Sequence, residues 1–141
     1  MLRDELIRYY YRGNGYNYNC AESMLRACND YFNLNLPDVL FYAASGYGGG
    51  MGHNELCGGL ASAVSVLGVL YSVNGKGHDS PYLRELTNEL FSRFEEKLGK
   101  GKCKELKELY SIPERRCEPI LVICADVLED IISRNEPVNR R

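Results

Sequence analysis

The chain has 141 residues, and its 17 basic and 19 acidic side chains give a formal charge of -2. A chain of this length buries about two-thirds of the surface that its unfolded form exposes, so it needs no disulfide or metal merely to fold. The scattered basic residues argue against a nucleic-acid partner, and the longest apolar run, 119–125, is too short to cross a membrane.

The first helix is predicted from apolar residues at helical spacing over 2–12, followed by a turn at Gly13-Asn14-Gly15. A second helix over 19–32 is indicated by a capping box in which Asn19 is answered by Glu22. A third is expected over 37–44 because proline suits a first turn, although 39–43 could also form a strand.

The middle of the chain is rich in small residues. Segment 46–52 holds five glycines in seven residues, and a helix capped by Asn54 is expected over 55–72. Each glycine inside that helix costs about 1 kcal/mol relative to alanine. We therefore expect another helix or a bound group to approach its backbone closely.

The last third predicts three more helices. Ser80-Pro81 begins one whose apolar stripe reaches Leu98, a short one follows over 103–110, and the last runs from Pro119 to about 134. The sequence shows no internal repeat or linker. We therefore expect an all-α, single-domain bundle of about five to seven helices that spans residues 1–141.

Six cysteines are more than packing alone requires. The N-terminal residues carry acidic side chains where an export signal would need a basic start and an apolar run, so we expect a cytoplasmic protein. That compartment keeps ordinary thiols reduced. Metal ligands or redox thiols are therefore favoured over structural disulfides.

Four of the cysteines fall at the starts of expected helices: Cys20, Cys57, Cys103 and Cys117. Unpaired backbone N–H groups and the positive end of the helix dipole stabilise a thiolate there, which predicts low pKa values. Cys28 and Cys124 lie inside helices among apolar neighbours and are expected to be small buried hydrophobic residues.

Spacings of 37, 46 and 14 positions separate the four cysteines. No Cys-x-x-Cys pair occurs, so the local motifs of zinc fingers, bacterial ferredoxins and thioredoxin-like proteins are absent. Tertiary folding must assemble any shared site. From spacing alone, four unrelated buried thiols are as good an interpretation as one common site.

The other motifs argue against a nucleotide-binding site and against a metal site built from histidines. In the glycine segment, Met51 occupies the place of the third glycine of a dinucleotide fingerprint, and Lys76-Gly77 lacks the hydroxyl residue of a P-loop. His53 and His78 each stand alone in a glycine-rich loop, which is typical of a solvated histidine. Tyr18 is close enough in sequence to Cys20 to touch a site there.

Three segments together resemble the C_GCAxxG_C_C family of redox-active proteins: 15–25, 46–52 and 55–59. Cys103 and Cys117 match the family's third and fourth cysteines in order and spacing. Gly59 and Ser62 stand where the family motif has alanine and glycine, so that element is imperfect. The resemblance covers nearly the whole chain and implies a four-cysteine redox site.

A related domain accompanies the split-Soret cytochromes, where an iron-sulfur centre and haem occur, but the Cys-x-x-Cys-His motif of covalent haem is absent here. Three functions stay open. The four cysteines hold an iron-sulfur cluster and exchange electrons with a partner protein, or act without metal as a thiol-disulfide oxidoreductase, or bind zinc in a non-catalytic interaction module. The oligomeric state is open, a homodimer included.

The glycine segment and the start of the helix after it are expected to form the wall of the cysteine site. Glycine lets backbone N–H groups approach sulfur or a bound anion. The residues concerned are Gly48, Gly49, Gly50, Gly58 and Gly59.

Overall fold

The computed structural model describes residues 1–139. In this range the chain forms seven α-helices, joined by loops and short helical turns: α1 (Leu2–Tyr10), α2 (Cys20–Tyr31), α3 (Asp38–Ala44), α4 (Gly58–Tyr71), α5 (Pro81–Leu98), α6 (Cys103–Tyr110) and α7 (Glu118–Ser133). Extended pairing in the described residues is limited to two isolated bridges, Val73 with Lys76 and Ile112 with Arg116. The all-α prediction is confirmed, and the strand alternative at 39–43 is wrong because that segment lies in α3.

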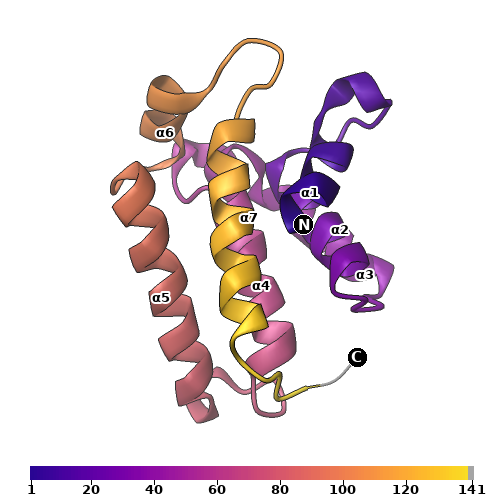
Figure 1. Cartoon of the computed structure of the whole chain (residues 1–141), viewed down its shortest axis with the longest axis vertical. Helices are drawn as coiled ribbons and strands as arrows, with labels where there is room; N and C mark the ends of the chain where they lie inside the picture. The colour runs from indigo at the N-terminus through magenta and orange to yellow at the C-terminus, as the bar shows by residue number, and fades with distance from the viewer. Residues whose placement is uncertain (140–141) are drawn as a thin grey trace.

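The long helices α4, α5 and α7 pack against one another, while α1 and α2 form a second layer on α7 and α4 (Figure 1). The short helix α6 lies at one end, beside the start of α7. One buried hydrophobic cluster contains side chains from all seven helices, with Leu6, Met24, Leu67 and Leu128 among those that are fully enclosed. Within residues 1–139, no helix is both long and apolar enough to span a membrane.

Helix α4 begins three residues later than predicted. Asn54 does not cap it and has a positive φ of 57°, and Cys57 occupies the N-cap position instead. The reason is the backbone before it: Gly49, Gly50, Met51 and Gly52 all have φ between 63° and 66°. This left-handed turn closes with a 2.9 Å hydrogen bond from the Glu55 N–H to the Gly50 carbonyl, so the right-handed helix starts only after it.

The prediction of close approach to the small-residue helix is correct at one end of α4 only. A Cβ added at Gly58 would lie 2.7 Å from the Cys20 sulfur, and one added at Gly59 would clash with Leu121. At Gly68 an added Cβ would meet nothing within 4 Å. The close approach is therefore concentrated where α4 starts, next to Cys57.

Candidate functional site

All four cysteines singled out from the sequence lie at helix starts. Cys20 is the first residue of α2 and Cys103 the first residue of α6. Cys57 and Cys117 are the N-cap residues of α4 and α7. The chain therefore presents four thiols from four different helix N-termini.

These four side chains line one cavity of about 20 Å³. The remaining lining residues are mostly apolar, and they are Gly58, Leu106, Lys107, Ile120 and Leu121. A volume of this size holds about one water molecule. The fold thus brings four cysteines that are far apart in the sequence to one small, largely apolar space.

Helices α2 and α4 meet without a gap beside Cys20. The missing side chain of Gly58 makes room for both the Cys20 sulfur and the Tyr47 carbonyl, each 2.7 Å from the position of an added Cβ. One turn further, the buried Ser62 hydroxyl donates a 2.8 Å hydrogen bond to the Ala21 carbonyl. Ser62, which replaces the glycine of the family motif, therefore ties α4 to the residue after Cys20.

The glycine turn holds α6 in place. A Cβ added at Gly50 would lie 2.6 Å from the Cys103 Cβ, so only glycine allows this approach. Lys102, the N-cap residue of α6, forms a 3.0 Å ion pair with Glu55 just after the turn. Cys103 is thereby carried against the segment that leads into Cys57.

The last residue of α1 fixes the start of α7. The Cys117 N–H donates a 3.2 Å hydrogen bond to the Tyr10 hydroxyl. Arg116 stacks its guanidinium 4.0 Å from the centre of the Tyr10 ring and donates a 2.7 Å hydrogen bond to the Tyr10 carbonyl. This role of Tyr10 was not predictable from the sequence, because no local signal links two residues so far apart in the chain.

The thiols of the cavity are harder to ionise than the sequence predicted. Burial raises the pKa of Cys57 to about 12 and also raises the pKa values of Cys20 and Cys103, and the neighbouring cysteines add to the effect. Backbone N–H groups at the helix starts and the Lys107 ammonium beside Cys103 act in the opposite direction. The expected lowering is therefore wrong for these three, because loss of hydration outweighs the backbone N–H groups and the Lys107 ammonium.

Several backbone N–H groups nevertheless point at the sulfurs. Gly49 donates to the Cys20 sulfur, and Gly59 and Leu60 donate to the Cys57 sulfur. Such hydrogen bonds favour the thiolate over the thiol. They stabilise the charge that the sulfurs would carry when bound to a cation.

The other two cysteines do not line the cavity. Cys28 and Cys124 are completely buried, and burial raises the pKa of each far above that of an ordinary thiol. The pKa of Cys124 is raised further by Cys57, Cys28 and Cys20, so Cys124 lies in the core near two cysteines of the site.

The five glycines assigned to the site have different surroundings. Gly58 lines the cavity, and an added Cβ at Gly59 would lie 3.8 Å from the Cys57 sulfur. Gly49 donates to Cys20 and Gly50 contacts Cys103. Gly48 packs against the Asn19 side chain instead.

Tyr18 does not line the cavity. Its ring stacks on Tyr16 with the ring centres 5.5 Å apart, and the Arg26 guanidinium lies 4.4 Å from its centre. Sequence proximity to Cys20 therefore placed the wrong tyrosine at the site.

The donor set has the composition of an iron-sulfur or zinc site, since four thiolates suit either. Across residues 1–139, no group of three or more His, Cys, Asp or Glu side chains is already arranged to hold a metal ion. His53 and His78 are exposed, as expected of solvated loop histidines.

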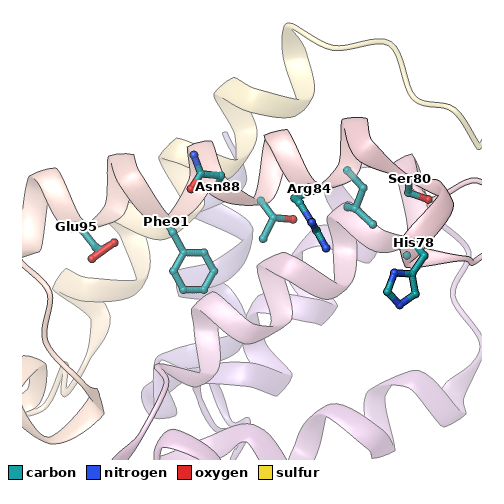
Figure 2. Close-up of a pocket in the computed structure, with 9 residues that line it drawn as sticks. His78, Ser80, Arg84, Asn88, Phe91 and Glu95 are labelled. Atoms are coloured by element: carbon teal, nitrogen blue, oxygen red, sulfur yellow. The ribbon is translucent and has the colours of Figure 1, made fainter.

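A larger groove of about 720 Å³ lies elsewhere, along α5 and the loop before it. Figure 2 shows the polar and aromatic side chains along it: His78, Ser80, Arg84, Asn88, Phe91 and Glu95. No cysteine lines this groove. The larger groove and the cysteines thus lie in different places. Thiol redox chemistry requires the cysteines, so the cysteine cavity is the candidate site.

Residues 18–131 match the protein family described as "Putative redox-active protein (C_GCAxxG_C_C)". The chain belongs to this family. The matched region contains all four cysteines of the cavity, and the resemblance seen in the sequence is confirmed. No curated protein and no solved structure matches this C_GCAxxG_C_C protein.

Proposed function

We propose that this C_GCAxxG_C_C protein uses Cys20, Cys57, Cys103 and Cys117 as one redox site, and that the site holds an iron-sulfur cluster for electron transfer or redox sensing. The observation that carries the proposal is that four thiols from four helix starts line one cavity. The redox-active description of the family supports it. The role implies a partner protein that gives or takes electrons.

The protein's own groups suit a bound, negatively charged sulfur centre. The N–H groups of Gly49 and Gly59 are aimed at the sulfurs of Cys20 and Cys57. Leu106 and Leu121 are buried at the cavity wall and exclude water. A cluster would supply a one-electron couple, and the N–H donors and dry surroundings would tune its potential.

The protonation of the thiols favours a bound cation in the cysteine cavity. Without one, burial and mutual repulsion keep the thiols of Cys20, Cys57 and Cys103 protonated. A bound cation replaces those protons and removes the repulsion between the thiolates. Metal binding should therefore release protons and strengthen as pH rises.

A single zinc ion is the second candidate, and the size of the cavity favours it. A space of about 20 Å³ has room for one ion once the cysteine side chains turn to bind it, whereas a cluster also requires the walls to move outward. Zinc bound by four cysteines would staple α2, α4, α6 and α7 together. It would carry no electrons, which is why the redox character of the family ranks the cluster first.

Anaerobic purification followed by an absorption spectrum and by iron, sulfide and zinc analysis tests the proposal. Visible charge-transfer bands with stoichiometric iron and sulfide are the expected result. Stoichiometric zinc without iron would select the staple. Absence of all three after anaerobic metal and sulfide reconstitution would leave a metal-free thiol-disulfide oxidoreductase and overturn the metal site.

A further inference from the structure

An open groove of about 540 Å³ adjoins the cysteine cavity. Cys117 and Lys107 line both spaces, so they form the wall between them. The groove is also lined by Tyr10, Ser111 and Arg116. Its volume is in the range of sites that bind small molecules. The redox site thus has a neighbouring space through which a small molecule can approach Cys117.

The groove is positively charged. Lys107 and Arg116 line it, and no acidic side chain is among its lining residues. Glu118, one residue beyond Cys117, is neutralised by a 3.1 Å ion pair with Arg115. The Ser111 hydroxyl also lines the groove, but it donates its proton to the Lys107 carbonyl at 2.6 Å. An ammonium and a guanidinium are groups that bind carboxylates and phosphates.

Arg116 is held in place before any ligand arrives. Its guanidinium stacks on the Tyr10 ring and donates to the Tyr10 carbonyl, and its backbone pairs with Ile112 through hydrogen bonds of 2.7 Å and 3.0 Å. The Nε atom is buried and has no hydrogen-bond partner within the described part of the chain. Arg116 therefore places a fixed positive charge at the wall of a groove that has no acidic side chain among its lining residues.

We propose that this groove binds the carboxylate or phosphate group of a small molecule and positions that molecule next to Cys117. The inference rests on the proposed function in taking Cys117 as part of the redox site, and it names the class of substrate or electron carrier that reaches the site. Anionic molecules would be concentrated beside the thiol, and neutral or cationic ones would not.

Two alkylating reagents that differ in charge test the proposal on reduced, metal-free protein. Iodoacetate is an anion and iodoacetamide is neutral, and both form the same carbon-sulfur bond with release of iodide. Peptide mass mapping gives the rate for each at Cys117. The ratio of the two rates cancels differences in thiol reactivity between variants, so it reports attraction of the anion.

The variant Lys107→Gln should lower the iodoacetate-to-iodoacetamide ratio at Cys117 by about threefold or more. Lys104→Gln is the matched control, since Lys104 is exposed on the same helix but does not line the groove, and it should leave the ratio unchanged. Inorganic phosphate should slow iodoacetate at Cys117 more than chloride does at equal ionic strength.

Equal ratios in wild-type protein and Lys107→Gln, or protection by phosphate no better than by chloride, would overturn the proposal. Failure of both reagents to label Cys117 would also overturn it, because the groove would then not open onto that thiol. These results do not depend on a cofactor. A protein that holds neither iron nor zinc can still show the anion preference, and a cluster protein can still lack it.

Discussion

The backbone N–H of Cys103 donates a 2.6 Å hydrogen bond to the carbonyl oxygen of Glu55, two residues before Cys57. The N–H of Glu55 in turn donates to the Gly50 carbonyl at 2.9 Å. Glu55 therefore couples the left-handed glycine turn to the first residue of α6. The positions of Cys57 and Cys103 relative to each other depend on this one connection. The glycine turn is therefore part of the framework of the site.

Gly50→Ala should disrupt the cysteine site. The new Cβ would lie 2.6 Å from both the Cys103 Cβ and the Glu55 nitrogen, and alanine would also have to adopt a φ of 63°. Gly52→Ala is the matched control, because its φ of 65° imposes the same backbone cost, about 1–2 kcal/mol, with nothing within 4 Å of the added atom. We expect both variants to lose stability in chemical denaturation and only Gly50→Ala to lose metal content. Equal metal content in the two variants would contradict the role of the turn.

Gly58→Ala tests the contact between α2 and α4 without backbone strain. The added Cβ would lie 2.7 Å from the Cys20 sulfur and from the Tyr47 carbonyl. Gly68→Ala in the same helix meets open space and should stabilise the protein by up to about 1 kcal/mol, through helix propensity alone. We expect Gly58→Ala to destabilise the fold and to lower cofactor content per folded molecule. Retention of full cofactor by a folded Gly58→Ala protein would show that Cys20 is not a ligand.

Tyr10→Phe removes the hydroxyl that accepts the N–H of Cys117 at 3.2 Å. The free energy of unfolding should fall by about 1–2 kcal/mol because a part-buried donor loses its partner. Tyr71→Phe is the control, since the Tyr71 hydroxyl donates to the Asn135 carbonyl at 2.8 Å and Tyr71 does not line the cavity. Only Tyr10→Phe should also reduce metal retention against a chelator. Identical chelation kinetics in the two variants would argue against a role for Tyr10 in holding Cys117.

Metal-free protein should lose stability at high pH. Burial raises the pKa of Cys57 from 9.0 to about 12, so between these values the unfolded chain has released a proton that the folded chain keeps. The contribution is complete below pH 9 and is lost as pH rises toward 12, by up to about 1.4 kcal/mol per pH unit. Urea denaturation at pH 8, 9 and 10 under reducing conditions measures it. Cys57→Ala should flatten the decline, and parallel curves for the two proteins would refute the assignment.

The helices were predictable because each one carries local signals. The capping box of Asn19 and Glu22 starts α2 as expected, and Pro81 stands in the first turn of α5. The start of α4 was not predictable in the same way. Asn54 resembles a cap, but four successive left-handed residues before it keep the chain out of the helical conformation until Cys57.

The candidate site was only partly accessible from the sequence. Helix starts identified the four cysteines, because the relevant signal lies within a few residues of each one. The contacts of Tyr10 with Cys117 and of Gly50 with Cys103 depend on tertiary packing between distant segments. The direction of the thiol pKa shifts was also missed, since burial at the junction of four helices cannot be read from any one helix end.

Cofactor content of single Cys→Ala variants tests most directly whether the four cysteines form one site. Iron, sulfide and zinc would be measured per folded protein after anaerobic purification of variants at Cys20, Cys57, Cys103 and Cys117, with Cys28→Ala as the control because Cys28 is buried away from the cavity. We predict that each of the four variants loses most of the cofactor and that Cys28→Ala retains the wild-type amount. Loss in only two of the four, or an equal loss in Cys28→Ala, would contradict a single four-cysteine site.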